Sequence, residues 1–335
     1  MPRLLIIRFS AMGDIAMTAP VIKQLACSYP DLEISMVSRP FAAAFFTKDI
    51  LGECAQRIRF IGINPKAPEY SGVLGLERLY RKLSSEHYDY VADFHGVLRT
   101  HYLRLRFRLA GVRTAVIDKH RNERRSLVAS GDKKVRHQLP TSFENYADVL
   151  RRLGFQLPPL GAPQRLANRD SMSIGIAPFA AHQGKVLPVE TMERAIQMVI
   201  ERTPDMQILL FGRGKQEDEV FGRWTEKYPQ CRRVTDMAKN LSEELEIMRN
   251  LRCMVSMDSA NMHLASLVGT RVVSIWGATH PWAGFMGWGQ SVDDAIQADL
   301  DCRPCSIFGN KPCMRGDMVC MKQISAERIV EKILS

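Results

Sequence analysis

The first residues that could do chemistry follow an apolar run near the start of the chain. The run IIRF leads into the turn SAMGD, which ends in Asp14. A turn that cradles a dinucleotide phosphate normally carries G-x-G-x-x-G, but Gly13 is the only glycine in this turn. Ligands of open α/β sheets bind beyond the carboxyl ends of strands, and a helix dipole stabilises an acid there. Asp14 is therefore a candidate general base, and a plain helix N-cap is the alternative.

Two later segments carry side chains that suit a diphosphate. The loop APFAAHQGKV places Lys185 between a strand and a helix, where its ammonium group can act as a compact cation for phosphate. The segment VSMDSANMH ends a strand at Asp258 and Ser259, and His263 follows on the same helical face as Ser259. Amides at that helix start, with the serine hydroxyl, can hold phosphate oxygens. A solvated loop lysine and a satisfied core histidine are the alternatives.

The last third of the chain contains an aromatic loop and a group of cysteines. The loop WGATHPWAGFMGWG suits either stacking on a base or sugar or packing of the loop itself. A C-x2-C pair follows, with two more cysteines downstream, which could supply four thiolates to structural zinc although the second pair lacks knuckle spacing. Packed free thiols or a disulfide are the alternative for these residues, which are Cys302, Cys305, Cys313 and Cys320.

The composition limits the classes of function. A chain of 335 residues with 46% hydrophobic residues can form two domains with cores of their own. No secretory signal or transmembrane stretch is apparent, so we expect a cytoplasmic protein whose eight cysteines are mostly reduced. The net charge of +10 indicates an anionic partner. Nucleic acid is not expected, because the basic stretch 99–137 contains only Tyr102 and Phe107 as stacking aromatics.

The elements that must position these residues alternate between strand and helix patterns, which is typical of parallel sheets. A helix is expected to begin after the N-cap Thr141 and to stop at Gly154, and a proline-rich linker is expected over 155–170. The predicted strands cover 4–9, 32–37, 57–63, 88–94 and 113–118 before the linker, and 173–178, 206–212, 252–258 and 271–277 after it.

Two facing Rossmann-like domains with an interdomain cleft follow from this pattern. We expect the first domain over 1–160 and the second over 161–335, which includes the cysteine-rich loop and a terminal helix in SAERIVEKIL. The terminal helix could cap either domain.

The order of the motifs is more specific than any one of them. SAMGD followed by TAP, the P-x5-GK-x2-P loop, DS-x3-H, WGATHP and the terminal cysteines together resemble the heptosyltransferases, glycosyltransferase family 9. The resemblance covers nearly the whole chain and is strongest over 10–20 and 257–281. It implies a GT-B fold and inverting transfer of heptose from ADP-heptose to the lipopolysaccharide inner core, with no metal or cofactor beyond the nucleotide sugar.

The resemblance also implies roles for single residues. Asp14 would be the general base. The donor would contact Lys185, Asp258, Ser259, His263 and Glu217. The acceptor, a phosphorylated lipid-linked glycan at the cytoplasmic face of the inner membrane, is expected to meet Ser10, Gly13, Arg99, Lys119, Arg121 and Arg124.

Three alternatives stay open at this point. The chain departs from the usual family pattern at Phe179, Leu187 and Ala260, so a relative that uses another nucleotide sugar for a different surface glycan is one of them. A catalytically inactive protein that binds nucleotides or polyanions is the second. A sugar-nucleotide epimerase of the same fold, which needs no acceptor, is the third.

Overall fold

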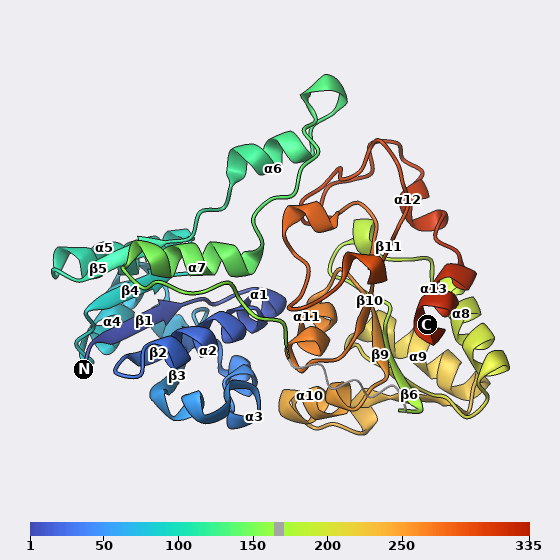
Figure 1. Ribbon diagram of the computed structural model, residues 1–335, viewed down its shortest axis with the longest axis horizontal. Helices are drawn as coiled ribbons and strands as arrows, with labels where there is room; N and C mark the ends of the chain where they lie inside the picture. The colour runs from blue at the N-terminus through green and yellow to red at the C-terminus, as the bar shows by residue number, and fades with distance from the viewer. Residues whose placement is uncertain (164–170) are drawn as a thin grey trace. The chain divides into compact units, whose positions relative to one another are not determined.

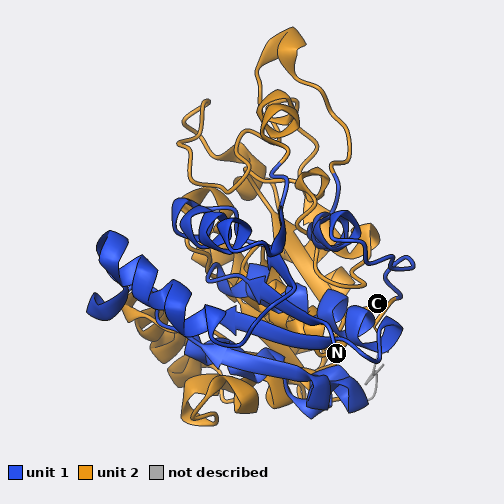
Figure 2. Ribbon diagram, turned by 90° about the vertical axis from the view of Figure 1, so that its left-hand side faces the viewer, with its two compact units in different colours: residues 1–119, 140–161 blue, residues 120–139, 162–335 orange. Residues whose placement is uncertain are grey.

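The computed structural model describes residues 1–163 and 171–335, and the chain divides into two units. Unit 1 consists of 1–119 and 140–161, and unit 2 consists of 120–139 and 162–335 (Figures 1 and 2). Each unit contains a parallel β-sheet with helices packed on it. The predicted α/β architecture with two parallel-sheet domains is thus confirmed. Part of the predicted linker, 164–170, lies outside the described residues.

Unit 1 has a five-stranded sheet of order β3-β2-β1-β4-β5. Helices α4 and α5 cover one face, which buries Leu5 and Ile7 of the central strand, and helices α2 and α7 pack together on the other. The strands are β1 (Arg3–Ile7), β2 (Glu33–Ser38), β3 (Ile58–Gly62), β4 (Tyr90–Asp93) and β5 (Arg113–Val116). The helices are α1 (Met12–Ala16), α2 (Thr18–Ser28), α3 (Lys48–Leu51), α4 (Gly72–Ser84), α5 (Leu98–Leu109) and α7 (Ser142–Arg152).

Helix α7 shows how local sequence sets an element boundary. The Thr141 side chain accepts a hydrogen bond from the Glu144 amide at 3.2 Å, and the Glu144 carboxylate accepts one from the Thr141 amide at 2.7 Å. This reciprocal capping satisfies amides that the first helical turn leaves without partners. Gly154, with φ +103°, follows the last turn. The expected helix start and stop are confirmed.

Unit 2 has a six-stranded sheet of order β11-β10-β9-β6-β7-β8. Helices α8, α9 and α13 form one core with the sheet, so the terminal helix belongs to this unit, and α11 packs on β9 and β10. The strands are β6 (Ser173–Ala177), β7 (Gln207–Leu210), β8 (Cys231–Arg233), β9 (Cys253–Met257), β10 (Val272–Trp276) and β11 (Ala295–Gln297). The helices are α8 (Val189–Arg202), α9 (Lys215–Lys227), α10 (Leu241–Arg249), α11 (Ala260–Leu267), α12 (Val319–Lys322) and α13 (Ala326–Leu334).

Residues 120–139, which we call the basic strap, belong to unit 2 although the sequence placed them in the first domain. The strap contains α6 (Arg121–Leu127), and it is drawn in the colour of unit 2 in Figure 2. Its buried Leu127 and Leu139 pack with Ala283 and Ile307. The Leu139 amide also donates to the Trp282 carbonyl oxygen at 2.8 Å. The predicted boundary therefore needs this correction, because the partners of the strap lie far along the chain.

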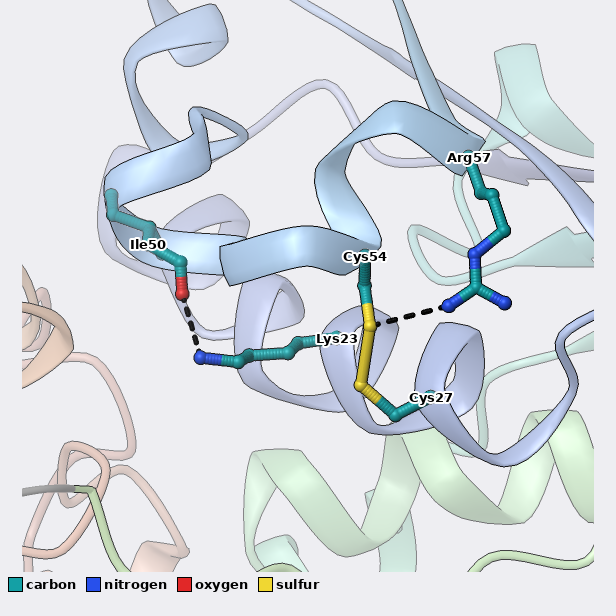
Figure 3. Close-up of a disulfide and its surroundings, with 5 residues drawn as sticks. All are labelled: Lys23, Cys27, Ile50, Cys54 and Arg57. Carbon is teal, nitrogen blue, oxygen red and sulfur yellow. Dashed lines mark hydrogen bonds between the residues drawn. A yellow bond between two sulfur atoms is a disulfide. The ribbon is translucent and has the colours of Figure 1, made fainter.

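A disulfide joins Cys27 of α2 to Cys54, which lies in a 3₁₀-helix before β3 (Figure 3). Lys23, one turn before Cys27, donates to the Ile50 carbonyl oxygen at 3.0 Å, and Arg57 donates to the Cys54 sulfur at 3.4 Å. The other six cysteines are free. The expectation of reduced cysteines is therefore wrong for this pair, which ties the segment between β2 and β3 to α2.

Candidate functional site

Asp14 lies in the first turn of α1, directly beyond the carboxyl end of β1. Its Oδ2 atom accepts a hydrogen bond from the Ala11 amide at 3.0 Å and forms an ion pair with Nη2 of Arg8 at 2.8 Å. The Asp14 side chain keeps 31% of its surface exposed. Ala11, and not Asp14, is the N-cap of α1, and the Asp14 carboxylate that accepts from the Ala11 amide still meets solvent.

Arg8 is the buried partner that holds Asp14. Its guanidinium lies 5.4 Å from the ring centre of Tyr146 and donates to the Phe94 carbonyl oxygen. Burial is the largest single influence on the pKa of Arg8 and lowers it, but Asp14, Tyr146 and Asp93 together raise the pKa above its ordinary value. The Tyr146 hydroxyl donates to the Asp14 carbonyl oxygen at 3.1 Å. Sequence reasoning missed this role, although a basic residue inside an apolar strand pattern was a usable signal.

His95 is a second polar group at this edge that the sequence did not single out. It follows β4, the strand next to β1, and its Nε2 atom lies 3.1 Å from the Ser10 hydroxyl. The buried Asp93 carboxylate fixes the loop by accepting from the amides of His95 at 3.0 Å and Gly96 at 2.8 Å. Burial and then the Arg8 charge lower the pKa of His95 to about 4. The ring is therefore neutral at neutral pH.

The predicted acceptor residues divide between the two units. Arg99 and Lys119 both act on the pKa of His95 through their charges, which places them near Ser10 in unit 1. Arg121 and Arg124 lie in the basic strap, which belongs to unit 2. The Arg124 guanidinium lies 5.1 Å from the ring centre of Phe285 and 5.9 Å from that of Phe308. The prediction of one basic group within the first domain is therefore wrong for the two strap arginines.

The predicted donor residues Lys185 and Asp258 contact each other in unit 2. Lys185 ends a 3₁₀ turn, Gln183–Lys185, after β6, and Asp258 follows β9, the neighbouring strand. Nζ of Lys185 lies 3.0 Å from Oδ2 of Asp258 and donates to its carbonyl oxygen at 3.1 Å. The two side chains are 14% and 4% exposed. The backbone amide of Asp258 already donates to the Ile275 carbonyl oxygen. Asp258 therefore anchors Lys185 through its carboxylate but has no hydrogen-bond donor for a phosphate.

The start of α11 lies directly after this pair. Ser259 is the N-cap, but its side chain makes no capping hydrogen bond and instead lies 3.2 Å from the Ser256 hydroxyl. His263 is buried within the helix. Glu217 lies in the first turn of α9, after β7, and its carboxylate folds over the turn at Gly214, where an added Cβ would lie 2.6 Å from Oε2. The structure thus places these predicted residues after strands β9 and β7, on the two sides of β6.

The cysteine-rich loop packs against the turn that carries Lys185. Gly309 has φ +75°, and an added Cβ there would lie 2.6 Å from Cγ of Lys185. The Ala278 amide donates to the Gly184 carbonyl oxygen at 2.8 Å, and the Cys305 amide donates to the Ala278 carbonyl oxygen at 3.0 Å. Three segments that are distant in sequence therefore meet at Lys185 through their backbones.

Arg303, inside the C-x2-C pair, holds this loop to the sheet and was also missed. Its buried guanidinium donates to main-chain carbonyl oxygens of Trp276, Gly277, Thr279 and Ala298. Burial lowers its pKa, but the surrounding oxygens satisfy its donors. A charged residue between two cysteines was the signal available in the sequence.

The described residues give the suggested zinc site no support. Within the described ranges 1–163 and 171–335, no group of three or more His, Cys, Asp or Glu side chains is arranged to hold a metal ion. Burial raises the pKa of Cys305 and Cys320, which favours the thiol over the thiolate that zinc binds. Cys302, Cys305, Cys313 and Cys320 are free, and the last three line a cavity of about 560 Å³ with His182 and Gly184.

The aromatic loop after β10 packs against itself. Trp276 is fully buried and donates to the Ser274 hydroxyl at 2.9 Å. The rings of His280 and Trp282 lie 4.0 Å apart between centres, and Phe285 stacks on Phe308. The packing alternative therefore accounts for Trp276 and Trp282.

None of the described helices is both long and apolar enough to cross a membrane.

Comparison with known proteins identifies related chains. The model of glycosyltransferase family 9 (heptosyltransferase) matches residues 76–310. The solved E. coli heptosyltransferase WaaC with ADP is 16% identical with a TM-score of 0.68, covering 99% of this chain and 98% of its own. E. coli ADP-heptose lps heptosyltransferase II is 17% identical with a TM-score of 0.68, covering 99% and 97%. A family 9 glycosyl transferase from Veillonella parvula is 17% identical with a TM-score of 0.70, covering 99% and 97%. No curated protein matches.

Proposed function

Because the chain belongs to glycosyltransferase family 9, the heptosyltransferases, and is a glycosyltransferase, we propose that it transfers heptose from ADP-heptose with inversion. The acceptor would be a phosphorylated, lipid-linked glycan of the lipopolysaccharide inner core. WaaC has been solved with ADP and with ADP-2-deoxy-2-fluoro heptose, which supports this donor. Unit 1 would bind the acceptor and unit 2 the nucleotide sugar, at the cytoplasmic face of the inner membrane.

The observation that carries the proposal is the Lys185–Asp258 pair beside the start of α11. Negative charge develops on the diphosphate as its bond to the anomeric carbon breaks. A lysine already fixed by a carboxylate, together with the helix-start amides near Ser259, stabilises that charge without rearranging during the reaction. Asp258 would act as the positioning residue for Lys185.

Asp14 would be the general base on the acceptor side. The acceptor hydroxyl attacks the anomeric carbon opposite the diphosphate, the new C–O bond forms, and the proton passes to the Asp14 carboxylate. The buried Arg8 orients this carboxylate through their ion pair. Ser10 and neutral His95 would bind acceptor hydroxyls beside it.

The test combines nucleotide binding with turnover. Thermal shifts of wild type and Asp14→Asn would be measured with ADP, GDP, UDP and CDP, followed by transfer from ADP-heptose. We expect ADP alone to stabilise both proteins equally, by about 2.7 kcal/mol at a hundred times Kd. Transfer by Asp14→Asn should fall by a factor of about 10² to 10⁴. Asp31→Asn, at an exposed acid of the same unit, is the control and should keep full activity.

The other outcomes of this test would favour a different donor, a different base or a different function. Stabilisation by a different nucleotide would keep the mechanism and change the donor. Near-normal turnover by Asp14→Asn would remove the general-base role. No response to any nucleotide would favour an inactive polyanion-binding protein.

A further inference from the structure

Helix α5 carries leucines on the side that faces away from the core. Leu98, Leu105 and Leu109 are 86%, 46% and 72% exposed. With 3.6 residues per turn they lie within about 40° of one another around the helix. Leu103 and Phe107, which are buried against the sheet, lie on the opposite side. We call the three exposed residues the leucine crest.

The leucine crest is not the exposed margin of the hydrophobic core. Single exposed apolar side chains are ordinary on protein surfaces. Here, however, three leucines follow one line along a helix of 12 residues, diametrically opposite its buried face. Three exposed leucines aligned along one helix differ from scattered single residues, and exposed apolar groupings mark interaction sites.

The charged side chains of helix α5 itself all have one sign. Helix α5 contains four arginines and no acidic residue. Arg104 pairs with Asp93 and Arg106 pairs with Glu77. Arg99 and Arg108 therefore add positive charge to α5 in addition to these two ion pairs, in a chain whose net charge is +10.

We propose that the leucine crest docks unit 1 onto an anionic lipid bilayer. The leucines would enter the boundary between headgroups and acyl chains, and the flanking arginines would meet lipid phosphates. A bilayer suits this surface because a single helix crest is convex, whereas a protein partner would need a groove shaped to it. The biological purpose, reaching a lipid-linked acceptor, rests on the proposed function, but the surface itself rests on α5 alone.

The test is co-sedimentation of the full chain with vesicles. We would compare vesicles of phosphatidylcholine alone with vesicles that also contain phosphatidylglycerol. Wild type should partition onto the anionic vesicles, and the triple variant Leu98→Ser/Leu105→Ser/Leu109→Ser should partition about 100-fold less. The matched control is Met172→Ser/Met237→Ser/Val292→Ser, which removes exposed apolar side chains of unit 2 and should bind as wild type does.

Three outcomes separate the explanations. Unchanged vesicle binding by the crest variant would overturn the proposal. So would a wild-type dimer in sedimentation velocity that the crest variant converts to monomer without loss of vesicle binding, since the crest would then be a subunit interface. An unchanged melting temperature and ADP shift would show that the variant is folded. Absence of an ADP response in wild type would count against the proposed function and leave the vesicle result standing.

Discussion

Asp14 and Lys185 share one design at the level of the single residue, because each is held by an opposite charge within its own unit. Arg8 is the buried partner of Asp14, and Asp258 is the buried partner of Lys185. Removing Asp14 or Lys185 would leave the more deeply buried Arg8 or Asp258 as an uncompensated charge, which costs far more than the pair contributes. The benefit of such pairs is orientation, since both charged groups are fixed before any substrate arrives.

Gly309 also helps to position Lys185, because the absence of a side chain at Gly309 leaves room for the methylene groups of Lys185. In Gly309→Ala the new Cβ would lie 2.6 Å from Cγ of Lys185, so the lysine side chain must shift, and we expect its contact with Asp258 to weaken. We expect ADP to bind about tenfold more weakly, the loss of one charge-assisted hydrogen bond, while adenosine binding is unchanged. Isothermal titration would measure both affinities.

Gly316→Ala is the matched control for that variant. Gly316 has φ +76° against +75° at Gly309, but a Cβ there meets nothing within 4 Å. Both variants therefore strain the same backbone conformation, and only one displaces Lys185. In a Lys185→Ala background, Gly309→Ala should add no further loss. Equal losses for the two glycine variants would refute the positioning role.

At the level of the element, the strands show what a sequence pattern can and cannot reveal. The nine predicted strands are present because short apolar runs stand out locally, most clearly where both faces of a parallel strand are buried and less so in the partly exposed edge strands β3 and β5. Strands β8 and β11 were missed because each has three residues, CRR and AIQ, without an apolar run. The residues after the predicted strands could be placed at the sheet edges, but their partners Arg8 and Arg303 could not.

The basic strap was assigned to the wrong unit for a related reason. Its helix pattern is local, but its packing partners Ala283 and Ile307 are far along the chain. No periodicity within the strap encodes which sheet it will join. Contacts between distant segments are the part of a fold that propensity and patterning leave undetermined.

Lys134 is the main polar anchor of the strap, which gives a prediction. Its ammonium group donates to the carbonyl oxygens of Asp301 at 3.3 Å, Cys302 at 2.8 Å and Pro304 at 2.9 Å. Lys134→Met should lower the free energy of unfolding of unit 2 by about 1–3 kcal/mol, because these oxygens lose a charged donor.

Urea unfolding monitored by tryptophan fluorescence measures the stability of unit 2 specifically. All four tryptophans, Trp224, Trp276, Trp282 and Trp288, lie in unit 2. Lys133→Met, at the exposed neighbouring lysine, is the control and should leave the midpoint unchanged. Equal midpoints for the two variants would mean that the apolar contacts of the strap suffice.

For the whole molecule, two histidines predict sensitivity to acid. Burial first, and then nearby arginine charge, lowers the pKa of His95 in unit 1 and of His280 in unit 2 to about 4. As the pH falls below the ordinary value of 6.5, the unfolded chain takes up protons that the folded chain does not bind until about 4. Stability should therefore fall with pH across that window.

Melting temperatures at neutral pH and at about pH 5 would measure the slope. His95→Gln and His280→Gln should each flatten it, and the tryptophan signal of unit 2 should report His280→Gln. His137→Gln, at an exposed histidine, should leave the slope as in wild type. A slope that is unaltered in both buried-site variants would assign the acid sensitivity to other groups.

The basic strap also has a consequence for synthesis on the ribosome. Lys134 and its partner Pro304 are separated by 170 residues, so the strap is made long before the surface it packs on exists. At about 5–20 residues per second, that interval is roughly 10–30 s. Unit 1, by contrast, has all of its strands and helices once residue 161 has been made. The nascent chain therefore carries a cationic loop, already extruded and without its partners, until the cysteine-rich segment is translated.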